Sequence, residues 1–291
     1  MKALYDVAAP AKLNLFLHIT GRRTDGYHLL QSVFMLIDWC DTLHFELRPG
    51  GQISREDLPG SLGHNAFMPP PLPADDLTLR AARALQSIAA CPLGVHITLT
   101  KRIPQQAGLG GGSSDAASTL LALNRLWGLN LPLAKLLEVG LQLGADVPFF
   151  LSGGHAWVEG IGEQLTPLAL PAARFRVVKP AAGLETARIF AAAELKRNTQ
   201  TATISGFAAM PQNCMLSFGR NDLQPVAEQL CPPVTQALQA LAAQGLQPRM
   251  TGSGSAVFAP IAADADVSEV AGCWVRDCNN LEAHPLRGWA L

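Results

Sequence analysis

The sequence predicts an α/β (α+β) protein with two domains. Its 291 residues are 48% hydrophobic, enough for a large core and for more than one domain. A strand pattern, a glycine-rich loop and a helix pattern follow one another from 95 to 127, and a loop of small residues leads into a second strand near 249–258. An edge-strand pattern over 157–165 marks the end of the first domain, so we expect domains over 1–160 and 161–291.

Charge and cysteine content exclude several classes of protein. The net charge is −1, from 22 basic and 23 acidic residues without a long charged block, which argues against a nucleic-acid or membrane partner. No apolar run approaches the roughly 20 residues of a membrane helix, and the N-terminus lacks a signal region. The six cysteines are scattered and read as reduced thiols. We therefore expect a cytoplasmic protein.

The first predicted strand carries two polar side chains next to each other. Apolar and polar residues alternate over 11–19, with Lys12 and Asn14 on the polar face. Alternation alone favours an ordinary solvent-exposed face, although Phe16 on the same side indicates some cover. A turn follows and ends in Tyr27 and His28.

The next elements lead up to the glycine loop. Residues 49–75 are rich in glycine and proline, including a proline run at 69–73, and predict a loop or irregular hairpin. Apolar residues at helical spacing predict a helix over 76–90. Residues 95–100 then alternate as a half-buried strand does.

The glycine loop itself predicts a phosphate site. Four glycines stand within five positions, 108–112, where backbone N–H groups can crowd around a ligand. The helix that follows directs its free N–H groups and positive dipole end to the same point, and Ser113 and Ser114 add hydroxyl donors.

Two familiar phosphate motifs do not fit this loop. No lysine lies between Pro104 and Asp115, which excludes a Walker motif, and the third glycine of a dinucleotide fingerprint falls on Ser113. A glycine-rich turn that only tightens the connection is the alternative to a phosphate site.

Asp146 allows two interpretations. After an amphipathic helix over 133–141, it precedes the apolar segment 147–150. It is either the N-cap of a short helix or a carboxylate held by apolar neighbours for proton transfer. Further on, a strand is expected at 175–178, a helix at 183–190, an irregular, mobile connection over 198–215 and a helix over 234–246.

Together these stretches resemble the GHMP kinase superfamily, which includes galactose, homoserine, mevalonate and phosphomevalonate kinases. The loop 104–114 matches its central motif and Thr-Gly-Ser-Gly-Ser at 251–255 its C-terminal glycine motif. Segments 10–15, 23–28, 144–149 and 220–223 resemble the branch that acts on a cytidine diphosphate alcohol, and the likeness runs in order from 10 to 258.

The resemblance implies a fold and a set of site residues. It implies the two-domain GHMP kinase fold, with the active site in the cleft between an ATP-binding N-terminal domain and a C-terminal domain that contributes to the substrate cleft. Lys12 and Asp146 match the catalytic pair. The implied ATP site comprises Lys101, Pro104, Gly108, Leu109, Gly110, Gly111, Gly112, Ser113 and Ser114. The implied substrate site comprises Asn14, Tyr27, His28, Thr186 and Phe190, with Tyr27 and Phe190 stacking on the cytosine ring.

The resemblance also implies the reaction. ATP, with Mg²⁺, would phosphorylate the 2-hydroxyl of the methylerythritol unit of a cytidine diphosphate alcohol, in non-mevalonate isoprenoid precursor biosynthesis. The alternatives are a homoserine- or mevalonate-type GHMP kinase and a non-catalytic ATP-binding sensor. The metal ligands are not identified, and we expect a monomer or weak homodimer.

Asp115 departs from the family's pattern, which often has asparagine or alanine there. A carboxylate so close to bound phosphates would repel them unless it caps the helix or binds Mg²⁺.

Overall fold

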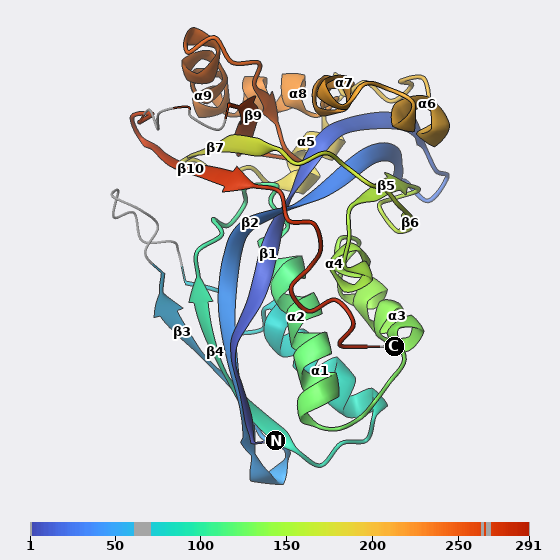
Figure 1. Cartoon of the computed structure of the whole chain (residues 1–291), viewed down its shortest axis with the longest axis vertical. Helices are drawn as coiled ribbons and strands as arrows, with labels where there is room; N and C mark the ends of the chain where they lie inside the picture. The colour runs from blue at the N-terminus through green and yellow to red at the C-terminus, as the bar shows by residue number, and fades with distance from the viewer. Residues whose placement is uncertain (1, 61–70, 263–264, 266–268, 291) are drawn as a thin grey trace.

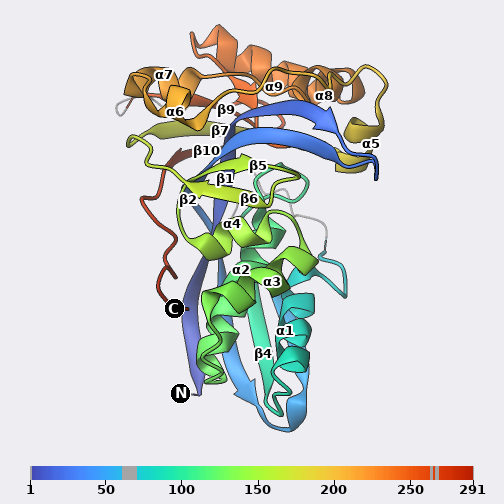
Figure 2. The same cartoon turned by 90° about the vertical axis from the view of Figure 1, so that its right-hand side faces the viewer.

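The computed structural model describes residues 2–60, 71–262, 265 and 269–290. The chain forms two layered halves, which a long N-terminal hairpin connects (Figures 1 and 2). Residues 61–70, which include part of the predicted loop and its first prolines, lie outside the described residues.

In the described part of the chain, the N-terminal half is built on a six-stranded sheet. Its strands are β1 (Ala3–Arg22), β2 (His28–Arg48), β3 (Ile53–Pro59), β4 (Gly94–Lys101), β5 (Ala156–Glu159) and β6 (Gln164–Pro167). Along the sheet the order is β3, β4, β2, β5 and β6, with β1 paired to β2. Only β3 and β4 among these pairs run parallel. The domain boundary expected at 160 therefore falls inside the β5–β6 hairpin, and the two-domain division stays a proposal.

Helices cover one side of this sheet, as both views of the fold show (Figures 1 and 2). They are α1 (Leu77–Ile88), α2 (Gly111–Leu126), α3 (Leu133–Leu143) and α4 (Val147–Ser152), and a short 3₁₀ turn η1 (Pro49–Gly51) follows β2. The predicted helices at 76–90 and 133–141 are confirmed. Leu120 and Leu123 of α2 pack with Phe45 and Ile97 of the sheet in a fully buried core.

The C-terminal half is a four-stranded antiparallel sheet with helices packed around it, within the residues that the structure describes (Figure 1). Its strands are β7 (Arg174–Pro180), β8 (Arg249–Met250), β9 (Val257–Ile261) and β10 (Cys273–Asn279), in the order β10, β7, β9, β8. Its helices are α5 (Thr186–Ala191), α6 (Ile204–Ala208), α7 (Gln212–Ser217), α8 (Gln224–Leu230) and α9 (Pro232–Ala243). The predicted strand at 175–178 and helix at 234–246 are confirmed.

The β1–β2 hairpin belongs to both halves. Its middle packs against the second sheet, where Leu13 and Met35 share a buried core with Phe175. Farther along, the Leu17 N–H donates to the Arg220 carbonyl oxygen at 2.9 Å. This hairpin brings residues of β1 to the junction between the halves.

This double contact overturns the expected solvent face of β1. Lys12 and Asn14 are only 3% and 1% exposed, and Phe16 is fully buried. The Phe16 ring packs against the Phe207 ring of α6 and against the Phe218 ring, at 6.3 and 4.9 Å between centroids. The alternation predicts which side chains share a face of the strand, but distant segments of the chain decide whether that face is buried.

Two further expectations differ from the structure. Residues 53–59 form β3, an edge strand that pairs parallel to β4, instead of a loop or hairpin. The expected connection over 198–215 contains α6 and the start of α7, with Phe207 and Met215 buried. Neither segment has a clear helical or alternating pattern, so the order of both comes from tertiary contacts.

Two expectations from composition can be compared with the structure. The cysteines are free thiols, as their scattered spacing predicts. No helix in the described ranges is long and apolar enough to cross a membrane.

Candidate active site

The glycine loop connects β4 to α2 and opens onto a cavity. Strand, loop and helix follow in the predicted order. Gly108 and Gly110 both have φ near +72°, the left-handed region that favours glycine. Gly110 precedes α2 and no side chain caps its first N–H groups, so these donors are left for a ligand.

Gly108 also allows the two halves of the molecule to touch. A Cβ atom at this position would lie 2.1 Å from the backbone oxygen of Thr251, in the second glycine motif. The Ser255 N–H donates to the Gln106 carbonyl oxygen at 3.0 Å and strengthens the same contact. The loop is therefore built for close backbone packing, which a tight turn alone does not require.

We expect Gly108→Ala to destabilise the fold more than Gly128→Ala does. Gly128 has φ +66° with no atom within 4 Å of the added Cβ, so alanine there adds only left-handed strain of about 1–2 kcal/mol. At Gly108 the same strain combines with overlap on Thr251, which costs about 1–3 kcal/mol more. The measurement is the free energy of unfolding in urea. Equal losses in the two variants would contradict this packing argument.

Lys12 lies directly under the loop. Its backbone N–H donates to the Leu109 carbonyl oxygen at 2.9 Å. Its ammonium donates to the Asn14 side-chain oxygen at 2.5 Å and lies 4.5 Å from the Phe34 ring centroid. Burial lowers the pKa of Lys12, and the negative charge of Asp146 opposes this shift. The result is a cation fixed in place at the base of the cavity.

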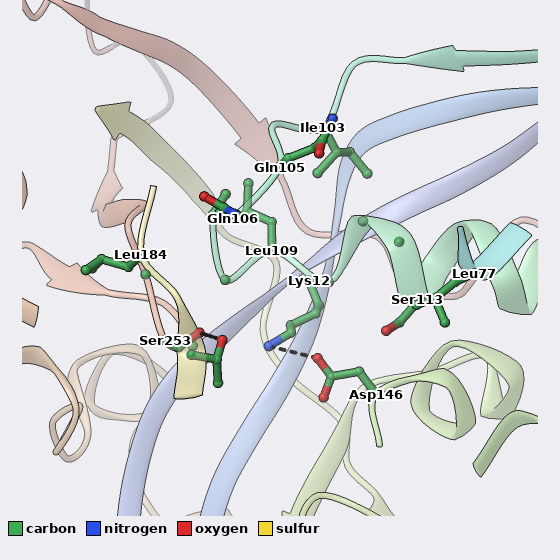
Figure 3. A pocket seen from close by; sticks show the side chains of 18 of the residues that line it. Lys12, Leu77, Ile103, Gln105, Gln106, Leu109, Ser113, Asp146, Leu184 and Ser253 are labelled. Carbon is green, nitrogen blue, oxygen red and sulfur yellow. Dashed lines mark hydrogen bonds and ion pairs between the residues drawn. The ribbon is translucent and has the colours of Figure 1, made fainter. Parts of the chain in front are cut away.

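Asp146 meets this cation from the other side. The Lys12 Nζ atom lies 3.5 Å from Asp146 Oδ2, and the two side chains point toward each other (Figure 3). Asp146 stands at the N-terminus of α4, yet its side chain makes no capping hydrogen bond. Asp146 thus occupies the N-cap position, as one of the two interpretations predicts, but its carboxylate does not cap the helix and faces Lys12 instead. Val147, Phe149 and Phe150 are fully buried behind it, while the carboxylate keeps 31% of its surface exposed.

Asn14 holds Lys12 and does not project freely toward a substrate. Its side-chain oxygen accepts from Lys12, and its Nδ2 donates to Ser32 Oγ at 2.9 Å. Its backbone N–H donates to Thr251 Oγ1, also at 2.9 Å. Ser32 and Thr251 are fully buried supports of Asn14. Thr251 begins the 251–255 motif, although its contact with Asn14 could not be predicted, and nothing in the sequence marks Ser32.

Lys101 is engaged by two carboxylates. Its ammonium donates to Asp115 Oδ2 at 2.7 Å and to Asp41, and all three residues are buried. Burial disfavours the charge of Lys101, but Asp115 and Asp41 outweigh it and raise the pKa of Lys101. Burial raises the pKa of the Asp115 carboxyl well above its usual value, and the Lys101 charge offsets only part of this.

This cluster changes the roles expected of Lys101 and Asp115. Lys101 lines the cavity wall, but its charge is taken up by Asp41 and Asp115 and not left for phosphate. Asp115 pairs with Lys101 and so does not cap the helix. Asp41 also accepts the Ile103 N–H at 2.8 Å, which anchors the start of the glycine loop. Asp41 could not be identified from the sequence, because Lys101 and Ile103, its partners, lie about 60 positions away.

The expected nucleobase residues come together only in part. The His28 and Phe190 rings lie 5.0 Å apart between centroids, at an interplanar angle of 33°. Tyr27 is 60% exposed and makes no ring contact with Phe190 among the described residues. Thr186 Oγ1 lies 2.7 Å from Ser253 Oγ, where α5 meets the second glycine motif.

These parts surround one cavity of about 980 Å³ at the junction of the two halves. Ser113 faces this cavity, whereas Ser114 is fully buried behind it. The lining includes Lys12, Asn14, Lys101, Asp146, Phe190 and the segments 103–113, 184–187 and 252–254. Donors for phosphate thus share one space with the Lys12–Asp146 pair.

Known protein families match segments in both halves of the chain. Residues 76–154 match the GHMP kinases N terminal domain and residues 199–280 the GHMP kinases C terminal family. Proteins of Polaromonas sp. (strain JS666) and Polaromonas naphthalenivorans, both named 4-diphosphocytidyl-2-C-methyl-D-erythritol kinase, are 69% and 67% identical. Each alignment covers 99% of this chain, and 95% and 97% of the relative.

Solved structures agree as well. A crystal structure of 4-(cytidine 5′-diphospho)-2C-methyl-D-erythritol kinase has a TM-score of 0.70 at 34% identity, over 89% of each chain. A homoserine kinase from Cytophaga hutchinsonii shares the fold, with a TM-score of 0.64 at 19% identity over 91% of this chain and 86% of that one. The chain therefore belongs to the GHMP kinases and, within them, to the 4-diphosphocytidyl-2-C-methyl-D-erythritol kinase family.

Proposed function

We propose that the chain transfers the γ-phosphoryl group of ATP to the 2-hydroxyl of 4-diphosphocytidyl-2-C-methyl-D-erythritol. The relatives' shared name supports the substrate. One observation carries the chemistry: Lys12 and Asp146, from distant parts of the chain, meet at 3.5 Å under the glycine loop.

Asp146 is the group that takes the proton. The substrate hydroxyl oxygen forms a bond to the γ-phosphorus as the bond from that phosphorus to the β–γ bridging oxygen breaks, and ADP leaves. The transition state of such transfers is loose, so the proton passes to the Asp146 carboxylate late. Its partly exposed carboxylate, with an apolar wall behind it, is open to a substrate from the cavity side.

Lys12 supplies a fixed positive charge beside the same oxygen. It lowers the effective pKa of the hydroxyl and attracts the Asp146 carboxylate to the same oxygen. Asn14 and the Phe34 ring hold the ammonium in position, so little reorganisation is needed during the reaction.

The glycine loop binds the phosphates through its backbone. The uncapped N–H groups at the start of α2 and the positive end of its dipole face the cavity together with Ser113. These donors stabilise negative charge on the transferring group without competing for the substrate hydroxyl.

The chain also has oxygen atoms suited to Mg²⁺. Ser114 Oγ and Asp115 Oδ1 are buried and have no hydrogen-bond partner among the described residues. Mg²⁺ prefers such oxygen ligands and commonly binds through one or two protein groups together with substrate phosphates. Bound Mg²⁺ would neutralise phosphate charge, and Ser114 and Asp115 are the residues that would hold it.

We expect kcat to fall at alkaline pH, with an apparent pKa below the value of about 10.4 for a free lysine. Burial lowers the pKa of Lys12, so its charge is lost as the pH rises through this lowered pKa. The measurement is kcat at saturating substrates from about pH 7 to pH 10.5, with a thermal melt at each pH as the control for unfolding. A flat profile over this range in the folded enzyme would contradict the role of Lys12.

Substrate comparison tests the function directly. ATP turnover should be fast with the cytidine diphosphate alcohol and at least about 10³-fold slower with free methylerythritol, mevalonate or homoserine, because these lack the nucleotide. Faster turnover of mevalonate or homoserine would favour another GHMP kinase activity. ATP binding without turnover of any alcohol would favour a sensor.

A further inference from the structure

Arg197 has no role in the mechanism described above, and it connects two segments that contribute expected substrate-binding residues. Its Nε–H donates to His28 Nε2 at 3.0 Å, which connects the segment after α5 to the start of β2. Its other N–H groups donate to backbone carbonyl oxygens at the end of α5. These are Ala193 (3.3 Å) and Leu195 (2.9 Å) from Nη1, and Phe190 (3.3 Å) and Ala192 (2.7 Å) from Nη2.

This arrangement uses every donor of the guanidinium. Arginine has five N–H groups in a fixed planar fork, and five contacts are present. A cation at the C-terminus of a helix is favourable, because the last carbonyl groups carry partial negative charge. Arg197 therefore fixes the end of α5, where Phe190 lines the cavity.

The contact with His28 also sets the state of its ring. Arginine stays protonated and can only donate, so His28 Nε2 must accept. A neutral histidine that accepts at Nε2 carries its proton on Nδ1. No described residue takes up this Nδ1–H group. His28 is therefore a hydrogen-bond donor with a fixed polarity, beside the Phe190 ring at 5.0 Å.

The charges around His28 favour the same state. The charged groups that act on it are Arg197, from the segment after α5, and Arg22, from the end of β1. Burial, Arg197 and Arg22 all lower the pKa of His28, so the ring is neutral at physiological pH. Phe190, on the other side, is uncharged.

We propose that Arg197 is a positioning residue for recognition of the nucleobase. It holds His28 as a neutral Nδ1–H donor for an acceptor atom of the base, and it fixes Phe190 as the adjoining ring wall. The cytosine edge offers such acceptors at O2 and N3. This inference rests on the proposed function, because it takes the cytidine group as the ligand.

Arg197→Ala tests this role against a matched control. Without Arg197 the Nδ1–H and Nε2–H forms of His28 exchange freely, so binding must first select the Nδ1–H form, and the end of α5 that carries Phe190 loses its anchor. At pH 8 we expect the cytidine diphosphate alcohol to bind about 10- to 100-fold more weakly, while kcat changes less than about threefold. The control is Arg188→Ala, which removes an exposed arginine of α5 that does not line the cavity and should bind as the wild type does.

The pH dependence separates positioning from a merely structural role. Burial and Arg22 still lower the pKa of His28 in the variant, so the second measurement is made at pH 5. There the ring takes up a second proton, which restores Nδ1–H, and binding should recover by at least about threefold. The wild-type protein should change by less than about twofold, because its donor is present at both pH values. Binding is measured by calorimetry without ATP, so that only the substrate side is tested.

Two further measurements keep the proposal testable if Arg197→Ala folds poorly. The ¹⁵N spectrum of labelled histidine in the wild-type protein should show the Nδ1–H form for His28, with the signal assigned by its loss in His28→Asn. Arg197→Gln, which can still donate to Nε2, should lose less affinity than Arg197→Ala and show no recovery at low pH. An Nε2–H form, unchanged affinity or equal losses at both pH values would overturn the proposal.

These outcomes are distinguishable from failure of the proposed function. If wild-type protein neither binds nor phosphorylates the cytidine diphosphate alcohol, the function is wrong, whatever the form of His28. If the wild type turns it over normally but Arg197→Ala binds it equally well, only the positioning role is wrong.

Discussion

Asp146→Asn is expected to lower kcat by about 10²–10⁴-fold, the range that a positioned general base contributes. Asparagine keeps the shape of the side chain but cannot take the proton of the substrate hydroxyl. The carboxylate faces Lys12 and makes no capping hydrogen bond, so the fold should survive the change. Rapid-quench measurement of phosphoryl transfer at saturating substrates gives the loss.

ATP binding is the internal control for this variant. The dissociation constant of ATP should stay within about threefold of the wild-type value, because the phosphate donors belong to the glycine loop. Glu138→Gln, an exposed change on neighbouring α3, should leave both quantities unaltered. Near-normal kcat in Asp146→Asn would remove Asp146 from the mechanism.

Lys12→Met is expected to lower kcat by about 10²–10³-fold, as loss of a preorganised charge does. Methionine fills most of the same space but leaves the Asp146 carboxylate and the Asn14 side-chain oxygen without their partner. Because Asp146 is 31% exposed and water can solvate it, the free energy of unfolding should fall by about 1–3 kcal/mol, less than for a fully buried pair. Lys135→Met, an exposed change on α3, is the matched control. A variant that keeps full kcat would show that the charge near the hydroxyl is unnecessary.

The local parts of the site could be predicted from the sequence. A strand, a glycine loop and a helix are encoded within about thirty neighbouring residues, and each signal is a matter of periodicity or backbone freedom. The pairing of Lys12 with Asp146 could not be read from any local pattern, and it came from resemblance to a family. The structure now brings the two side chains together.

The supports of the site could not be predicted, because they depend on distant contacts. Asp41 looks like any polar residue of a strand until the fold places it beside Lys101 and the backbone of Ile103. Arg197 lies in a segment without a clear pattern, and its partner His28 is 169 positions away. The burial of the polar face of β1 could not be predicted for the same reason, because distant segments of the chain and the cavity cover that face.

The central claim is that Lys12 and Asp146 act together on one hydroxyl oxygen, and a double-mutant cycle on phosphoryl transfer tests it most directly. If both residues act on the same oxygen, the double variant Lys12→Met/Asp146→Asn should have about the kcat of the slower single variant. Its fold-loss in kcat should be far smaller than the product of the two single fold-losses. Losses that multiply in full would mean that the two residues act independently, and would contradict the account.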